Sequence, residues 1–165
     1  MNDEILALAT AVLAACRQRG LQAATAESCT GGLVAAALTE IAGSSDVVDR
    51  GFVTYSNAAK QQMLGVPAQT LRDHGAVSRE TAEAMARGAL AKSAAGVVVA
   101  ITGIAGPGSS SDKPAGLVHF AAAARGGALK AVEMRYGDLG RAQVRHKSVL
   151  QALTMLREMA EHSSS

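Results

Sequence analysis

The spacing of apolar positions changes along this chain, and each change marks a predicted element. Between residues 4 and 19, apolar side chains recur at i, i+3, i+4 and i+7, which predicts an amphipathic helix ending at Gly20. Similar spacing and capping residues predict further helices over about 30–42, ending at Gly43; over a short segment capped by Asn57 and ended by Gly65; over a short turn opened by Pro67; over about 79–93, capped by Ser78; and over about 139–161, capped by Asp138. The inner face of the last helix is expected to consist of Ala142, Val149, Leu153, Leu156 and Ala160.

Denser apolar runs predict the strands. They cover about 21–26, 50–55, 96–102, 116–124 and 128–136, and the last two are joined by a hairpin at Arg125-Gly126-Gly127. The run at 96–102 is continuously apolar, which is typical of a strand covered on both faces. Helices alternate with the first strands, and the hairpin comes late. This order predicts an α/β fold over residues 1–165 as a single domain: a three-layer α/β/α sandwich whose mixed, mainly parallel sheet carries the antiparallel hairpin at one side.

Composition narrows the class of protein. Hydrophobic residues make up 48% of the 165 residues and aromatic ones only 2%, so the core relies on close approach of helices to the sheet. The net charge of +2, without a long basic run, argues against nucleic-acid binding. Asp3 and Glu4 at the N-terminus do not fit a secretory signal, and no apolar stretch reaches the length of a membrane span. We therefore expect a cytoplasmic protein that does not bind a membrane.

The cysteines and histidines indicate no metal or cofactor. Cys16 and Cys29 form neither a disulfide framework nor a metal-ligand spacing, and Cys16 falls on the apolar face of the first helix. His74 and His119 have no carboxylate at an informative spacing, so both are expected to be structural. We expect chemistry that needs neither a metal ion nor a cofactor.

The most informative segment is the turn between the first strand and the helix that follows it. Ser28 lies where backbone N–H groups are unpaired and a helix dipole favours negative charge, but a serine there also serves as an N-cap. Cys29 is a rival nucleophile, and Thr30 is an alternative cap. Gly31 and Gly32 cost helix stability, a cost usually compensated by close approach of a ligand or another backbone. The pattern therefore indicates either an N-cap or a nucleophile with neighbouring oxyanion donors.

A possible general base follows the second predicted strand. Tyr55 and Lys60 both project from the end of that strand, and either could take a proton from a nucleophile. A tyrosine at a strand end is more often a packing residue, and a helical lysine is more often solvated. For Lys60 to act as a base, burial or a nearby cation must lower its pKa. Glu27 either orients Lys60 or is simply exposed.

The segment after the most buried strand is rich in glycine. Thr102, Gly103 and Gly106 lie at the carboxyl end of a parallel sheet, where open α/β folds bind ligands, and would let backbone amides approach a phosphate or oxyanion. The loop lacks the full spacing of known nucleotide-binding motifs. Lys113 either contacts a phosphate or is the solvated tip of the loop. In the last helix, Arg141 and Arg145 either meet an anionic ligand or form a solvated face.

Five segments form an ordered set of motifs: Thr25-Ala-Glu-Ser-Cys-Thr-Gly-Gly32, Arg50-Gly-Phe-Val-Thr-Tyr-Ser-Asn57, Lys60, His74-Gly-Ala-Val-Ser78 and Thr102-Gly-Ile-Ala-Gly-Pro107. This set closely resembles the CinA C-terminal domain family, the nicotinamide-nucleotide amidohydrolases. The resemblance covers essentially the whole chain, which looks like the stand-alone form of the family.

The resemblance implies hydrolysis of the carboxamide of nicotinamide mononucleotide to nicotinate mononucleotide and ammonia, without a metal. It places the serine nucleophile at Ser28, the tyrosine at Tyr55 and the lysine at Lys60, and it implies a homo-oligomer in the cytoplasm. We expect Ser28, deprotonated by Lys60 with help from Tyr55, to attack the amide. Backbone amides at the start of the 30–42 helix, joined by one from the 102–106 loop, are expected to hold the oxyanion.

The substrate-binding residues expected on this basis are Thr30, Gly31, Gly32, Thr102, Gly103, Gly106, Arg141 and Arg145, with Lys113 as a further candidate for the phosphate. The alternative is a non-catalytic nucleotide-binding or interaction module, with a role in competence or the damage response. That alternative predicts ligand binding without release of ammonia.

Overall fold

The computed structural model describes residues 1–109 and 112–163. Its strands form one sheet in the order β2-β1-β3-β4-β5. They are β1 (Ala23–Glu27), β2 (Val48–Val53), β3 (Val97–Gly103), β4 (Leu117–Ala124) and β5 (Leu129–Arg135). β1 pairs in parallel with β2 and β3, whereas the β3–β4 and β4–β5 pairs are antiparallel. Among these strands β4 alone runs against the others, which confirms the mixed, mainly parallel sheet with its late hairpin.

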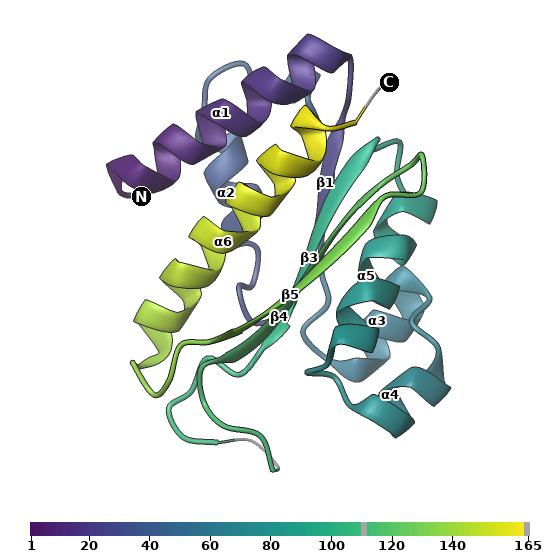
Figure 1. Ribbon diagram of the computed structural model, residues 1–165, viewed down its shortest axis with the longest axis vertical. Helices are drawn as coiled ribbons and strands as arrows, with labels where there is room; N and C mark the ends of the chain where they lie inside the picture. The colour runs from purple at the N-terminus through teal and green to yellow at the C-terminus, as the bar shows by residue number, and fades with distance from the viewer. Residues whose placement is uncertain (110–111, 164–165) are drawn as a thin grey trace.

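Helices cover both faces of this sheet (Figure 1). On one face lie α1 (Asp3–Arg19), α2 (Leu33–Thr39) and α6 (Arg141–Glu161); on the other lie α3 (Asn57–Leu64), α4 (Ala68–His74) and α5 (Arg79–Ala91). A short 3-10 helix, η1 (Ser44–Asp46), leads into β2. The three-layer α/β/α prediction is confirmed. Within the described part of the chain, no helix has both the length and the apolar character that crossing a bilayer requires.

The two faces of the sheet have different cores. The α1/α6 face is built from larger side chains, among them Ile101, Phe120 and Leu153. The α5 face is built mostly from alanine, which allows α5 to lie close to the sheet, as the composition predicted. Its alanines are Ala24, Ala26, Ala100, Ala121 and Ala123 in the strands, Ala82, Ala86 and Ala89 in α5, and Ala95 between α5 and β3. β3 is buried along nearly its whole length, which confirms a strand covered on both faces.

The start of α2 differs from the prediction. The helix begins at Leu33 rather than near residue 30, because Gly31 and Gly32 have φ angles of 58° and 103°. These left-handed backbone conformations cannot belong to a right-handed helix, and residues other than glycine rarely adopt them. The two glycines therefore form the turn that precedes the helix.

Two predicted caps are wrong. Ser56, not Asn57, is the N-cap of α3, and its hydroxyl accepts a hydrogen bond from the amide of Ala59 at 3.0 Å. The N-cap of α6 is Gly140 and not Asp138, so the helix begins two residues later than predicted.

The later start of α6 also moves the beginning of its apolar stripe. Ala142 is exposed, and Val144 is buried instead. Val149, Leu153, Leu156 and Ala160 are buried as predicted.

Candidate active site

A cavity of about 340 Å³ lies at the carboxyl ends of β1 and β3, where parallel α/β sheets bind ligands. Its lining comes from five parts of the chain: the turn after β1, the turn after β2 with the start of α3, the segment before α5, the glycine-rich loop after β3, and the start of α6. The lining residues are Ser28, Cys29, Tyr55, Lys60, Ala76, Val77, Thr102, Gly103, Ile104, Ala105, Gly106, Pro107, Gly108 and Arg141.

The structure brings Ser28 and Lys60 into direct contact. The Ser28 amide donates to the carbonyl oxygen of Ile101 at 2.9 Å, which extends the β1–β3 pairing by one residue and holds the backbone of Ser28. Lys60 projects from the first turn of α3 and is only 1% exposed. Its Nζ donates to Ser28 Oγ at 3.0 Å and to the carbonyl oxygen of Thr54 at 2.8 Å. Two side chains that are far apart in the sequence therefore form the polar centre of the cavity.

The burial of Lys60 changes its acid–base behaviour. Loss of hydration disfavours the ammonium and lowers the pKa of Lys60 from its usual 10.5. Among the described residues, no salt bridge to a carboxylate offsets this effect. A lysine in this setting loses its proton more readily, and the neutral amine can accept the hydroxyl proton of Ser28.

Cys29 lines the same cavity but has the properties of a structural thiol. It is 5% exposed, and burial raises its pKa to about 11. Near neutral pH such a cysteine is protonated, and the thiol is a far weaker nucleophile than the thiolate. The contact of Ser28 with Lys60 and the protonated state of the Cys29 thiol therefore favour Ser28 over Cys29 as the candidate nucleophile.

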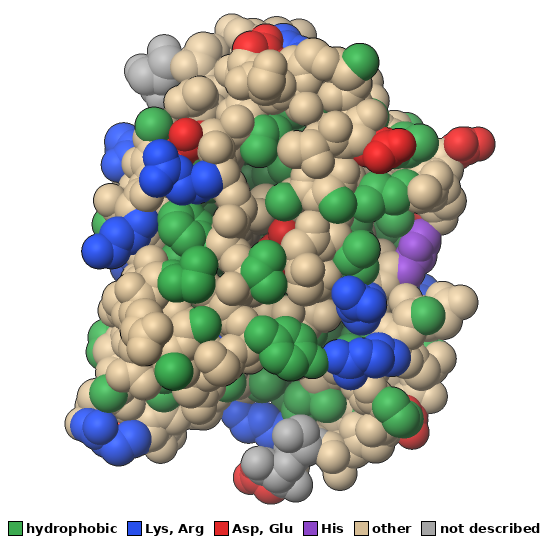
Figure 2. All heavy atoms as spheres, turned by 180° about the vertical axis from the view of Figure 1, so that it is seen from behind, with side chains coloured by type: hydrophobic (Ala, Val, Ile, Leu, Met, Phe, Trp, Pro, Cys, Tyr) green, Lys and Arg blue, Asp and Glu red, His purple; other side chains and the backbone are tan. Residues whose placement is uncertain are grey.

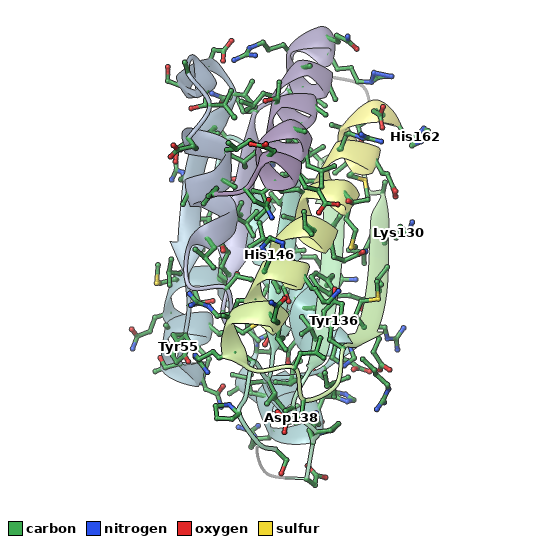
Figure 3. All side chains as sticks on the ribbon, turned by 90° about the vertical axis from the view of Figure 1, so that its left-hand side faces the viewer. Tyr55, Lys130, Tyr136, Asp138, His146 and His162 are labelled. Carbon is green, nitrogen blue, oxygen red and sulfur yellow. The ribbon has the colours of Figure 1, made fainter. Side chains whose placement is uncertain are left out.

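Tyr55 contacts Arg141 instead of Lys60. Its side chain is 61% exposed, and its hydroxyl accepts a hydrogen bond from the Arg141 guanidinium at 2.7 Å. The same guanidinium donates to the carbonyl oxygen of Gly106 at 2.9 Å. Figure 3 shows Tyr55 and Asp138 toward the end of the molecule where α6 begins. No hydrogen bond among the described residues joins Tyr55 to Ser28 or Lys60, so Arg141 is the partner that the structure gives to its hydroxyl.

Glu27 neither orients Lys60 nor is exposed, and both of these alternatives are wrong. Its side chain is fully buried, and its carboxylate accepts hydrogen bonds from the amides of Gly32, Val34 and Ala35 at 3.0–3.2 Å. The hydroxyl of Thr30 donates to the same carboxylate at 2.7 Å. Glu27 therefore caps α2, which no side chain at the Gly32 N-cap can do.

Most of the backbone amides before and at the start of α2 already have hydrogen-bond acceptors. The amides of Gly32, Val34 and Ala35 are bound to Glu27, and those of Gly31 and Leu33 donate to the carbonyl oxygens of Ser28 and Thr30. These five amides are therefore engaged, whereas the amides of Cys29 and Thr30 donate to no described residue.

The predicted binding residues fall into two groups. Thr102, Gly103, Gly106 and Arg141 line the cavity. Thr102 is also structural, because its hydroxyl donates to the carbonyl oxygen of Ala76 at 2.7 Å and holds that wall of the cavity. The other predicted residues, Thr30, Gly31, Gly32 and Arg145, do not line it.

Arg145 contacts the turn of Ser28, Cys29 and Thr30 from outside the cavity lining. Its guanidinium donates to the carbonyl oxygens of Cys29 at 3.2 Å and Thr30 at 3.4 Å. A Cβ on Gly31 would lie 3.3 Å from this guanidinium. The glycine pair is therefore explained by its backbone conformation and by the close approach of Arg145, rather than by a ligand.

The segment 74–78 forms one wall of the cavity, a role that its sequence did not predict. Ala76 and Val77 line the cavity, and Lys113 Nζ donates to the carbonyl oxygens of His74, at 3.1 Å, and Val77. Lys113 is thus neither a solvated tip nor part of the cavity lining, because it fastens the glycine-rich loop to this wall. Only the tertiary contact reveals that function, since the lysine lies 36 residues from Val77 in the sequence.

His119 lies outside the cavity lining and is 8% exposed. Burial lowers its pKa, and its Nε2 is 3.7 Å from the carboxylate of Glu133. Within residues 1–109 and 112–163, no three side chains of His, Cys, Asp or Glu come together as metal ligands. On the face shown in Figure 2, Lys and Arg side chains form several separate groups with apolar side chains between them.

Comparison with known proteins identifies relatives of two lengths. A model of the CinA C-terminal domain family matches residues 5–160. The nicotinamide-nucleotide amidohydrolase PncC of Escherichia coli K12 is 49% identical over 157 residues, which cover 94% of both chains. A CinA-like protein of Anaeromyxobacter dehalogenans is also 49% identical over 157 residues, but they make up only 37% of its length. The chain thus spans little more than a third of this longer relative.

Solved structures agree with the fold. The crystal structure of the competence/damage inducible protein CihA from Agrobacterium tumefaciens is 56% identical and superposes with a TM-score of 0.94, covering 96% of this chain and 97% of that one. A CinA superfamily protein from Escherichia coli, at 35% identity, superposes with a TM-score of 0.89 over 94% of this chain and 91% of its own.

Proposed function

This chain belongs to the CinA C-terminal domain family, and on that basis we propose that it hydrolyses the carboxamide of nicotinamide mononucleotide through a serine nucleophile. The products are nicotinate mononucleotide and ammonia. A relative of similar length, E. coli PncC, is a nicotinamide-nucleotide amidohydrolase by name. The observation that carries the proposal is the 3.0 Å contact between Lys60 Nζ and Ser28 Oγ inside the cavity.

The first half of the reaction forms an acyl-serine. Neutral Lys60 takes the hydroxyl proton of Ser28, and Ser28 Oγ attacks the carboxamide carbon. The carbonyl oxygen of Thr54, 2.8 Å from Nζ, stabilises the ammonium that results. When the tetrahedral intermediate collapses, its C–N bond breaks, and Lys60 returns the proton to the leaving nitrogen, which departs as ammonia. Lys60 then deprotonates a water molecule that cleaves the ester and regenerates Ser28.

The oxyanion is assigned to the glycine-rich loop. The amides at the start of α2 are bound to Glu27, and the amide of Ile104 donates to the carbonyl oxygen of Leu117. Ala105 and Gly106 line the cavity together with Ser28, and their amides donate to no described residue. Backbone N–H groups in such a loop stabilise developing negative charge without reorganisation.

Arg141 is the residue proposed to bind the 5′-phosphate. It lines the cavity, and its hydrogen-bond partners within residues 1–109 and 112–163, the Tyr55 hydroxyl and the Gly106 carbonyl oxygen, are neutral. Its positive charge is therefore available to an anion, and a guanidinium suits bidentate binding of phosphate. Tyr55 orients this arginine through the 2.7 Å hydrogen bond. Arg145 and Lys113 are both engaged with backbone carbonyl oxygens.

The decisive experiment measures ammonia released from nicotinamide mononucleotide by metal-stripped protein. Wild type should release it, whereas Ser28→Ala and Lys60→Met should not. Lys147→Met, which replaces an exposed lysine of α6, is the matched control and should retain full activity. Activity retained in Ser28→Ala would contradict the serine nucleophile. A folded wild type that binds the nucleotide without releasing ammonia would support the binding-module alternative.

A further inference from the structure

Glu27 is the fully buried carboxylate next to the proposed nucleophile. Its Oε1 accepts hydrogen bonds from the Thr30 hydroxyl and the amides of Gly32 and Val34, and its Oε2 accepts from the Thr25 hydroxyl and the Ala35 amide. Among the described residues, no Lys, Arg or His side chain forms a salt bridge with it. The charge is therefore stabilised by five neutral donors and by the positive end of the α2 dipole.

Capping alone does not require this arrangement. A helix is usually capped by a short side chain at the N-cap itself, which avoids burying a full charge. Here the N-cap is Gly32, without a side chain, and the capping group comes from a residue before the turn. The carboxylate of Glu27 thus spans the Ser28-Cys29-Thr30 turn and ties its two ends together.

The main chain of Glu27 is linked to Lys60, the proposed base, by hydrogen bonds through Thr54. Its carbonyl oxygen accepts a hydrogen bond from the Thr54 amide at 2.8 Å, and the Thr54 carbonyl oxygen accepts one from Lys60 Nζ at 2.8 Å. Glu27 is therefore bonded covalently to the nucleophile residue and linked through Thr54 to the proposed base. Because Lys60 is held through the Thr54 carbonyl oxygen, a shift of the Ser28 turn alone changes the distance between Ser28 Oγ and Lys60 Nζ.

We propose that Glu27 is a positioning residue whose carboxylate holds the Ser28 turn against α2, so that Ser28 Oγ stays within reach of Lys60 Nζ. Glu27 is not part of the cavity lining, so it acts through Ser28 rather than on the substrate. The proposal rests on the proposed Ser28–Lys60 chemistry. A misplacement of about 1 Å costs on the order of 10²-fold in rate, which sets the size of the expected effect.

The test compares Glu27→Gln with Asn2→Ala. Glutamine keeps the size of the side chain but replaces one acceptor oxygen with a donor that faces backbone N–H groups or hydroxyls. Asn2 caps α1 by accepting from the Ile5 amide at 3.0 Å, so Asn2→Ala removes a helix cap outside the cavity. At a temperature where circular dichroism shows both variants folded, Glu27→Gln should lower kcat for nicotinamide mononucleotide by on the order of 10²-fold, with KM within about threefold. Asn2→Ala should keep the kcat of wild type. An unchanged kcat in Glu27→Gln, or an effect on KM alone, would overturn the proposal.

A second measurement does not depend on the substrate. A fluorophosphonate labels activated serines, and intact mass with peptide mapping gives the rate of labelling at Ser28. Labelling should be fast in wild type and slower in Glu27→Gln by a factor similar to that in kcat. If wild type releases no ammonia but shows this difference in labelling, the proposed substrate is wrong and the positioning proposal stands. Failure of wild type to label at Ser28 would overturn the positioning proposal as well.

A milder variant covers the case in which Glu27→Gln does not fold. Thr30→Val removes the 2.7 Å donor and leaves the other four. It should lower kcat and the labelling rate together, by less than Glu27→Gln, without changing KM. Equal rates in Thr30→Val and wild type would then overturn the proposal.

Discussion

A methyl group added at Gly88 should reduce both stability and activity, although Gly88 does not line the cavity that contains Ser28 and Lys60. Gly88 is buried in α5, where this helix meets the end of α3. A Cβ at this position would lie 1.9 Å from the carbonyl oxygen of Leu64 and 2.8 Å from its carbonyl carbon, whereas real Cβ contacts essentially never fall below 3.0 Å. In a close-packed interior, Gly88→Ala therefore forces α3 and α5 apart by roughly 1 Å.

The stability effect combines two opposing terms. Overpacking of this severity costs about 3 kcal/mol, the upper part of the usual range. Alanine recovers about 1 kcal/mol of helix propensity relative to glycine. The net loss in the free energy of unfolding is thus about 2 kcal/mol, which in a chain of this size lowers Tm by roughly 4–8 °C.

The activity effect follows from the position of Lys60 on the displaced helix. Leu64 lies one turn after Lys60 in α3, so displacement of the helix end shifts Lys60 Nζ relative to Ser28 Oγ, now 3.0 Å away. A misplacement of this size should lower kcat by about 10- to 100-fold, with a smaller effect on KM.

The assay measures Tm by circular dichroism and kcat by ammonia release for Gly88→Ala and a matched control. Gly126→Ala makes the same chemical change in open space at the hairpin turn and should leave both quantities unchanged. A wild-type Tm in Gly88→Ala would refute the packing argument. A lowered Tm with unchanged kcat in the folded variant would refute the coupling between α3 and Lys60.

Three further predictions follow from single side chains. Because burial lowers the pKa of Lys60, the unfolded chain binds this proton more strongly than the folded protein does. The free energy of unfolding, measured with urea, should therefore rise with pH between the lowered pKa and 10.5 in wild type relative to Lys60→Met. Parallel plots of this free energy against pH for the two proteins would contradict the shift. Because burial raises the pKa of Cys29 to about 11, Cys29→Ala should keep kcat within about threefold, and iodoacetamide should not inactivate the native protein near neutral pH; rapid inactivation with an adduct on Cys29 would contradict this. Arg141→Ala should raise KM for nicotinamide mononucleotide by about 10- to 100-fold, the value of one charge-assisted interaction, and leave KM for nicotinamide riboside unchanged; an equal rise for both would show that Arg141 does not bind the phosphate.

Local signals in the sequence predicted the fold well. The helical period and Gly20 located α1, and the uninterrupted apolar run located β3 at the centre of the sheet. The errors were confined to element ends, where neighbouring residues compete for one role, as Ser56 and Asn57 do for the cap of α3. At the start of α2 the prediction failed because the backbone of Gly31 and Gly32 is left-handed, a conformation that the residue type permits but does not require.

The roles of polar side chains were less predictable. Ser28 and Lys60 lie near the ends of neighbouring parallel strands, which predicts that they come together, and the structure places them in contact. For Arg145 and Lys113 the sequence left open an anion contact or a solvated position, but each donates to backbone carbonyl oxygens. A charged residue near a ligand site and one that supports its walls look the same in a sequence, because its hydrogen-bond partners are set by packing.

The layers of the sheet and helices follow from the sequence alone, because the local spacing of apolar residues shows whether one face of a helix or both faces of a strand are buried. The positions of Ser28 and Lys60 along the chain also indicate them as the candidate nucleophile and base. Three-dimensional packing is needed to show that Glu27 caps α2, that the Tyr55 hydroxyl contacts Arg141, and that burial lowers the pKa of Lys60. These properties depend on hydrogen bonding and burial in three dimensions, and no pattern along the chain specifies them.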